Sequence, residues 1–119
     1  MYEIEFYEDK NGKSEVVEYI KHLSTLSSKD SRINLNKIIA YMDMLEEMGT
    51  RMGEPMTKHL KGQIWELRPL KNRILYAYYK GNKFIILHYF VKKTKKTPQK
   101  EIERAEKNLR DYMERREEL

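Results

Sequence analysis

Two hydrophobic periods, one following the other, constrain the fold of this chain more than any other feature of its sequence. Between residues 14 and 48, apolar side chains recur at steps of three and four, which is the period of an amphipathic helix. From residue 63 to residue 91 they recur at steps of two, which is the period of a β-strand. This succession predicts an α+β fold, with helices packed on a small, curved and largely antiparallel sheet.

The helical part divides into two amphipathic helices. The first has Asn11 or Ser14 as its N-cap and is broken before Ser31. The second opens near Ser31 and stops at Gly49, where a left-handed C-cap belongs. Its methionines either fill gaps in the core or line a plastic binding groove. We expect the two helices to pair antiparallel and to lie on the sheet.

Strands come both before and after these helices in the sequence. Residues 2–7 alternate as in a half-buried strand, and three further strands are predicted at residues 63–68, 73–79 and 84–91. Turns of about four residues join the last three strands, which is the pattern of an antiparallel meander. The strand at residues 84–91 is apolar on both faces and is therefore expected at the centre of the sheet.

A last helix starts at Thr97-Pro98, with threonine as N-cap and proline at the first helical position. Its apolar stripe includes Tyr112, which we therefore assign to the core. The predicted order of elements is β-α-α-β-β-β-α. Because 119 residues are enough for one domain with one core, we predict a single domain over residues 1–119.

Several classes of protein are excluded by what the sequence lacks. There are no cysteines, which rules out disulfides and thiolate metal sites and is typical of a reducing compartment. No apolar run approaches the ~18–20 residues of a membrane span. The N-terminal residues MYEIEFYEDK lack the basic and apolar regions of a signal peptide. We expect a soluble cytoplasmic protein that does not contact membranes.

The common catalytic motifs are missing as well. The sequence has no CxxC, HExxH, Walker or GxSxG motif. Its three histidines, His22, His59 and His88, have no ligand-like spacing, so we expect neither a metal nor a cofactor. His88 lies in the apolar strand, where it is either a buried imidazole with satisfied hydrogen bonds or a catalytic base.

Positive charge is concentrated in one third of the chain. From Lys58 to Lys96 there are nine lysines, two arginines and one acid, Glu66, giving a net charge of +10 in a chain whose total is +5. Charge segregated in this way indicates a polyanionic partner on one surface. Two of these cations, Arg68 and Arg73, stand five residues apart across a predicted turn. A hairpin can bring both guanidinium groups to one end of the sheet.

Such a cluster suits RNA cleavage as well as RNA binding. Guanidinium groups bind phosphate oxygens in a bidentate manner, and lysines supply mobile charges. The ribose 2′-hydroxyl is an internal nucleophile, so a protein need only orient it, move its proton and stabilise the negative charge on phosphorus. A lysine can move that proton if neighbouring cations lower its pKa. A passive RNA-binding face has the same composition.

Three blocks of sequence carry a resemblance to a known family. They are KHLKGQIWELR at residues 58–68, RILY at residues 73–76, and HYFVKKTKKTP at residues 88–98. In this order and spacing they closely resemble the HigB-type, phage-related branch of the RelE toxin superfamily. The matched blocks cover roughly residues 56–106, and the two predicted N-terminal helices agree with the family's layout.

The resemblance implies the toxin of a type II toxin–antitoxin system. Such toxins are mRNA interferases, endoribonucleases that enter the ribosomal A site, cut mRNA, inhibit translation and arrest growth. The implied partner is a HigA-like helix-turn-helix antitoxin, through which alone the pair would contact operator DNA. Two other functions stay open: a basic RNA- or DNA-binding module without catalysis, and a co-repressor of the operon bound to its antitoxin.

Site residues follow from the resemblance position by position. Arg73 and Lys93 are assigned to stabilisation of the transition-state phosphate, and Lys96 to proton transfer. Arg68 is assigned to phosphate positioning, or alternatively to an ion pair with Glu66 or with a helix acid. Further RNA contacts are predicted at Lys58, His59, Lys61, Lys71, Tyr76, Lys92 and Lys95.

The chain departs from better-known RelE toxins in two ways. It has Ile64 and Glu66 where those toxins have lysines in the strand before the first arginine. It also offers no unambiguous C-terminal catalytic tyrosine or histidine, which leaves the general base unassigned. The strand tyrosines Tyr76, Tyr78 and Tyr89 either stack on an RNA base or pack inside the protein.

Overall fold

Helices and strands follow one another as the two hydrophobic periods predict, with one strand added. The structure is a computed structural model that describes residues 1–117, so the last two residues of the predicted domain lie outside the described part. The elements are β1 (Glu3–Phe6), α1 (Glu15–Thr25), α2 (Lys29–Met48), the 3₁₀ helix η1 (Gly49–Met52), β2 (Thr57–Lys61), β3 (Ile64–Leu67), β4 (Asn72–Tyr79), β5 (Lys83–Val91) and α3 (Gln99–Glu117).

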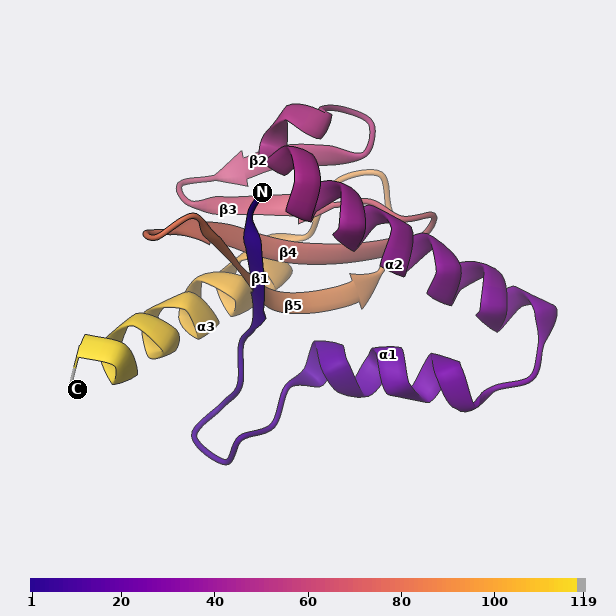
Figure 1. The fold of residues 1–119 in the computed structure, drawn as a ribbon, viewed down its shortest axis with the longest axis horizontal. Helices are drawn as coiled ribbons and strands as arrows, with labels where there is room; N and C mark the ends of the chain where they lie inside the picture. Colours follow the sequence, from indigo (N-terminus) through magenta and orange to yellow (C-terminus); the bar gives the residue numbers. More distant parts are fainter. Residues whose placement is uncertain (118–119) are drawn as a thin grey trace.

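One five-stranded sheet, in the order β1-β5-β4-β3-β2, forms the middle of the fold (Figure 1). Strand β1 runs parallel to β5, and the other three pairings are antiparallel. The predicted meander of three strands is therefore confirmed as β3-β4-β5. Strand β5 is an inner strand between β1 and β4, whereas β4 rather than β5 takes the central place.

Helices cover both faces of this sheet, which explains why its inner strands are apolar on both sides. Helices α1 and α2, joined by a short loop, form the predicted pair of antiparallel helices (Figure 1). Their core residues, Val16, Leu23, Ile38 and Leu45, pack with Leu67, Ile74, Tyr76, Phe84 and Ile86 of the sheet. On the other face, Ala105, Leu109 and Tyr112 of α3 pack with Ile64, Leu75, Ala77, Ile85 and Leu87. The assignment of Tyr112 to the core is confirmed.

Strand β2 is the element that the hydrophobic period missed. It lies at an edge of the sheet, and only Thr57 among its five residues is buried. Its ladder with β3 is interrupted between His59 and Lys61. Edge strands commonly carry lysines and irregular pairing, because both discourage further strand addition. Strand β2 is held by main-chain hydrogen bonds to β3, and most of its side chains are exposed. Its sequence therefore lacks the alternation of apolar and polar residues from which a strand is predicted.

The helix termini differ from the prediction by one or two residues. Ser14 caps α1, accepting a hydrogen bond from Val17 N at 3.2 Å. Helix α2 begins at Lys29, because the hydroxyl of Ser28 accepts from Ser31 N at 3.1 Å. Gly49 is the C-cap of α2, as predicted, but its φ of 62° is combined with a ψ of −150°, a conformation that favours glycine and is not the left-handed helical one expected. Among the helices of the described residues, none is both long and apolar enough to cross a membrane.

Candidate nucleic-acid interface

The turn between β3 and β4 places both arginines of the basic segment side by side. Arg68 follows β3 directly, and Arg73 is the second residue of β4. Asn72 N donates to Pro69 O at 3.1 Å, which closes the turn between the arginines. Leu70 takes a left-handed backbone with a φ of 61°, an uncommon conformation for a non-glycine residue. The predicted juxtaposition of Arg68 and Arg73 is therefore present.

Two helices hold this turn in place through the buried side chain of Asn72. Its Oδ1 accepts from the Tyr19 hydroxyl of α1 at 2.5 Å, and its Nδ2 donates to Asn34 Oδ1 of α2 at 2.8 Å. A buried amide needs such partners, since an unsatisfied polar group inside a protein costs free energy. The position of the arginines is thus determined by α1 and α2 as well as by the hairpin.

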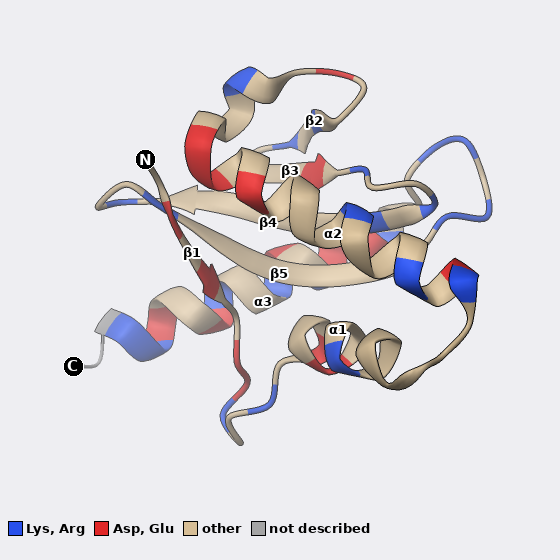
Figure 2. Ribbon diagram, turned by 45° about the vertical axis from the view of Figure 1, so that its right-hand side comes forward, with Lys and Arg blue, Asp and Glu red and all other residues tan. Residues whose placement is uncertain are grey.

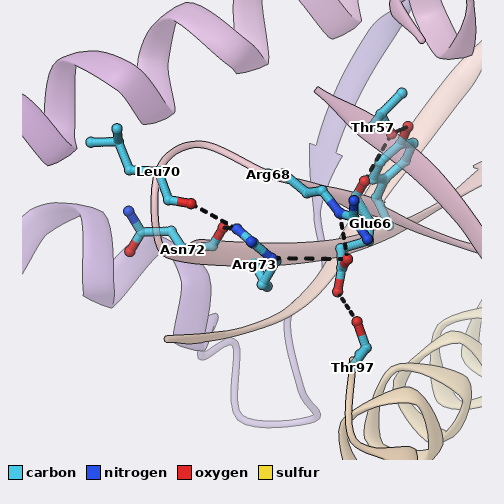
Figure 3. A network of polar contacts seen from close by, with 8 residues as sticks. Thr57, Glu66, Arg68, Leu70, Asn72, Arg73 and Thr97 are labelled. Atoms are coloured by element: carbon cyan, nitrogen blue, oxygen red, sulfur yellow. Dashed lines mark hydrogen bonds and ion pairs between the residues drawn. The ribbon is translucent and has the colours of Figure 1, made fainter. Parts of the chain in front are cut away.

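Glu66 lies between the two arginines and has no exposed surface (Figure 3). Arg68 Nε donates to Glu66 Oε1 at 2.9 Å, and Arg73 Nε lies 4.0 Å from the same oxygen. The predicted alternative for Arg68, an ion pair with Glu66, is therefore present. This hydrogen bond uses Nε, so it occupies neither of the two terminal nitrogens of Arg68.

The guanidinium of Arg73 is held by backbone oxygens as well. Its Nη1 donates to Leu70 O at 2.8 Å and to Asn72 O at 2.9 Å (Figure 3). The side chain is 12% exposed, and burial lowers the pKa of the guanidinium, as does the nearby charge of Arg68, while the charge of Glu66 opposes both. Arginine nevertheless keeps its charge in proteins. Arg73 is thus a preorganised cation with one edge toward the protein.

A basic loop of residues 92–96 is attached at both of its ends to the β3–β4 hairpin. At its start, Lys92 N donates to Lys71 O at 2.8 Å. Just after its end, the Thr97 hydroxyl donates to Glu66 Oε2 at 2.5 Å. The prediction that Thr97 caps α3 is replaced by this contact, and α3 begins at Gln99. Figure 2 shows the blue loop between β5 and α3 beside the β3–β4 turn.

The lysine side chains of the basic loop face solvent. Lys93, Lys95 and Lys96 are exposed, and Lys92 is partly buried. The Thr94 hydroxyl donates to Lys96 O at 2.8 Å and so bends the loop on itself. Lys71 is exposed as well, in the turn that carries the arginines. The structure thus gathers Arg68, Arg73, Lys71 and the basic loop at one end of the sheet.

Lys58 belongs to the same face of the sheet as Glu66. The two residues are directly paired between β2 and β3, and directly paired side chains project on the same side. Lys58 is exposed, and the lysine lies one strand away from the arginines. Its predicted RNA contact is compatible with this place.

His59 and Lys61 are not gathered with the arginines. The ring of His59 packs against Trp65, with centroids 5.1 Å apart, on the opposite face of β3 from Glu66. Its Nε2 lies 2.7 Å from Gly62 O. Lys61 pairs with Ile64 at the far end of β3 from Arg68. Alternation along β2 separates His59 from Lys58, a consequence that becomes visible only once β2 is known to be a strand.

The prediction of an RNA contact for Tyr76 does not fit the structure. Tyr76 is 0% exposed inside the core beneath α1 and α2, and its hydroxyl lies 2.6 Å from Thr57 Oγ1. Burial raises the pKa of this phenol to about 12, although the hydrogen bond with Thr57 lowers it. Tyr89 stacks on Tyr19 with centroids 4.1 Å apart. Packing is thus the role of both rings.

Phe90 is an aromatic residue at the site that the sequence analysis missed. It pairs directly with Arg73 across β4 and β5, and it is partly exposed. The two side chains therefore project on the same face, beside the basic loop that starts two residues later. Its position between His88 and Lys92 was the available signal, but strand alternation alone could not place it opposite Arg73.

His88 is a buried imidazole with hydrogen-bond partners on both nitrogens. Its Nδ1 contacts Glu15 of α1, and its Nε2 lies 2.7 Å from Glu101 Oε1 of α3. Of the two roles considered for His88, the structure therefore supports the satisfied buried residue. Within residues 1–117, no group of three or more His, Asp or Glu side chains is arranged to hold a metal ion.

Comparison with known proteins assigns the chain to a family. Residues 19–110 match the family described as "Phage derived protein Gp49-like (DUF891)". The chain belongs to this Gp49-like family. No curated protein has a significant sequence match to this Gp49-like chain.

Solved structures share its fold at low sequence identity. One is the YoeB-YefM complex from Staphylococcus aureus, with 15% identity and a TM-score of 0.56 over 78% of the Gp49-like chain and 99% of the other. Another is the archaeal RelE-RelB complex from Pyrococcus horikoshii OT3, with 17% identity and a TM-score of 0.51 over 76% and 93% of the two chains. The family match confirms the predicted phage-related family, and the likeness to the YoeB and RelE structures is one of fold.

Proposed function

We propose that the Gp49-like chain is the toxin of a type II toxin–antitoxin pair and cleaves mRNA on the ribosome. The observation that carries the proposal is the attachment of the basic loop at both ends to the β3–β4 hairpin that bears Arg68 and Arg73. A charge cluster of this kind on one end of a sheet suits a polyanion. The shared fold supports the proposal, since one of the two solved relatives contains RelE, the protein after which the resembled toxin superfamily is named, and both are complexes with a second protein.

The reaction needs preorganised positive charge more than any other group. In the proposed step, the 2′-oxygen forms a bond to phosphorus, and the bond from phosphorus to the 5′-oxygen breaks. A base takes the proton of the 2′-hydroxyl, and an acid supplies one to the leaving oxygen. The products are a 2′,3′-cyclic phosphate and a 5′-hydroxyl. Such a reaction proceeds without a metal or a cofactor when fixed cations stabilise the extra charge on phosphorus.

We assign charge stabilisation, phosphate positioning and proton transfer to individual residues according to the contacts that fix each side chain. Arg73, partly buried and fixed by two carbonyl groups, stabilises the charged phosphorane together with Lys93. Arg68 positions the phosphate with its terminal nitrogens, since its Nε is bound to Glu66. Lys96 is the proposed proton donor or acceptor. Further contacts along the RNA come from Lys58, Lys71, Lys92 and Lys95.

The proposed partners follow from the family resemblance. The toxin is expected to act in the cytoplasm on mRNA in the ribosomal A site and to be neutralised by a HigA-like helix-turn-helix antitoxin. It would reach operator DNA only through that antitoxin. The titles of the two solved relatives name a second protein in each complex, YefM and RelB, which supports an antitoxin partner here.

A single deoxyribose substitution tests the reaction. Cut sites are first mapped on an all-ribose mRNA in a cell-free translation system, and one 2′-deoxy sugar is then placed directly 5′ to a mapped phosphate. We expect this mRNA to be bound but not cut there, whereas a deoxy sugar two nucleotides away leaves cleavage unchanged. Normal cleavage at the deoxy position would refute the proposed chemistry. Salt-sensitive binding without a cut in any mRNA would support a non-catalytic binding module instead.

A further inference from the structure

Glu66 is the one acid of the basic segment, and it is also fully buried. A carboxylate out of contact with water is stable only if cations and hydrogen-bond donors surround it. Both of its oxygens have such partners. Arg68 and Arg73 lie against Oε1, and the Thr97 hydroxyl donates to Oε2 (Figure 3).

These contacts join three separate parts of the candidate interface. Arg68 directly follows β3, Arg73 belongs to β4, and Thr97 directly follows the basic loop. Glu66 accepts a hydrogen bond from Arg68 Nε at 2.9 Å, which leaves both terminal nitrogens of Arg68 for a ligand. Arg73 Nε lies 4.0 Å from Glu66 and its Nη1 donates to Leu70 O and Asn72 O, so Nη2 is the nitrogen that Arg73 can offer to a ligand. Through Thr97, Glu66 also determines where the basic loop ends. One side chain therefore sets the relative position of the guanidinium groups and of the lysines.

We propose that Glu66 is a positioning residue for RNA cleavage, which holds the arginines and the basic loop in the arrangement that the transition state needs. The inference rests on the proposed function and adds a role for an acid that does not touch the RNA. It also explains why the basic segment keeps one acid, Glu66, although a neutral or basic residue there would attract RNA more strongly. Positioning matters to catalysis, because a displacement of about 1 Å can slow a reaction by about 10²-fold.

Glu66→Gln tests this role because glutamine has nearly the same shape and no charge. Arg68 and Thr97 donate to different oxygens of Glu66, and the amide has an NH₂ group in place of one of them, so it cannot accept from both residues in their present positions. We expect kcat for mRNA cleavage to fall by about 10–10²-fold. KM should stay the same or decrease, because the site gains net positive charge and the freed arginines still attract phosphate. A fall in kcat with no rise in KM is the signature of lost positioning.

Glu5→Gln is the matched control. Glu5 also accepts from two cations, Lys83 at 2.9 Å and Arg116 at 2.8 Å, but it lies in β1 at the opposite edge of the sheet from β2. We expect its substitution to leave kcat within about twofold of the wild-type value. Equal kcat values for Glu66→Gln and Glu5→Gln would overturn the proposal. Thermal unfolding of both variants shows that the comparison is made on folded protein.

Thr97 provides a second test if Glu66→Gln does not fold. Thr97→Val removes the hydroxyl from a partly exposed residue, whereas Thr97→Ser keeps it. We expect kcat to fall several-fold in the valine variant and to be retained in the serine variant. Equal activity in the two variants would contradict a role for the Glu66–Thr97 contact in positioning the basic loop.

An NMR measurement separates this inference from the proposed function. A hydrogen bond to a buried carboxylate should slow exchange of the Arg68 Hε proton, and Glu66→Gln should accelerate it. If wild-type protein does not cut mRNA under any condition, the proposed function fails. If wild-type protein cuts mRNA, and Glu66→Gln accelerates Hε exchange without lowering kcat, only the positioning role is wrong.

Discussion

The imidazole of His88 and the carboxylate of Glu101 meet 2.7 Å apart and join β5 to the first turn of α3. On its other side His88 contacts Glu15, which lies in the first turn of α1. Glu15 Oε2 also lies 3.6 Å from Arg104 Nη2. One ring therefore ties both helix starts to the sheet. Only a doubly protonated imidazole can donate to both carboxylates.

This contact predicts a pH-dependent stability. Burial opposes the charge on His88, but the two carboxylates outweigh it and raise the pKa above the ordinary value of 6.5. The contribution of His88 is complete below about pH 6.5 and is lost as the pH rises through the raised folded-state pKa. We expect the unfolding temperature to decrease as the pH rises above about 6.5, and His88→Gln to reduce that decrease.

His22→Gln is the control for this measurement, since His22 is exposed on the same helix as Glu15. It should keep the wild-type dependence on pH. Identical pH profiles for wild type and His88→Gln would contradict the ion-pair role of His88.

The basic loop predicts a salt dependence of binding. Each lysine that contacts a phosphate releases condensed counterions, so affinity for ribosome or RNA decreases with salt by roughly 0.7–0.9 log units per log unit for each contact. Lys92→Ala and Lys95→Ala should each flatten this slope. Lys21→Ala, an exposed position on α1, should not. Fluorescence anisotropy over a salt series measures the slope, and unchanged values in both loop variants would make the loop merely a solvated edge.

Arg73→Ala should greatly reduce the rate of cleavage and only slightly reduce the free energy of unfolding. Removing one preorganised charge from a transition state costs about 10²–10³-fold in rate. The carbonyl groups of Leu70 and Asn72 also lose their donor, and because water can reach the exposed one, the cost in unfolding free energy is about 0.5–1.5 kcal/mol. Cleavage is therefore to be measured well below the unfolding temperature. Arg51→Ala, at an exposed arginine of η1, is the control, and full activity of Arg73→Ala would remove Arg73 from the site.

Tyr19→Phe tests the anchoring of the arginine turn from a distance. The substitution removes the donor to Asn72 Oδ1, and an unsatisfied buried acceptor costs about 1–3 kcal/mol. We expect this loss in urea unfolding, together with slower cleavage because the turn between Arg68 and Arg73 loosens. Tyr78→Phe, at a tyrosine that is 47% exposed, should change neither quantity by more than about 0.5 kcal/mol or twofold. Equal stability of the two variants would show that the Tyr19 contact contributes nothing.

Much of the fold could be predicted from the sequence because helices and strands bury their apolar residues at different periods. That signal placed α1, α2, β3, β4 and β5 correctly, and family blocks around Arg68 and Arg73 located the candidate site. Strand β2 was missed because an edge strand is held by main-chain pairing and needs no apolar alternation. His59 therefore appeared to belong with Lys58, although the strand places them on opposite faces.

Only the tertiary structure decided that Glu66 and Tyr76 are buried. Alternation correctly set Glu66 and Arg68 on the face opposite Trp65 and Leu67, but that face would be open to water if α3 did not cover part of it. Because α3 and the basic loop close over β3, Glu66 is buried and must be paired. Tyr76 is hidden by α1 and α2 for the same reason. Alternation in the sequence determines on which face of the sheet a side chain lies. Whether that face is covered by a helix or loop, or is exposed to water, depends on how elements distant in the sequence pack against it.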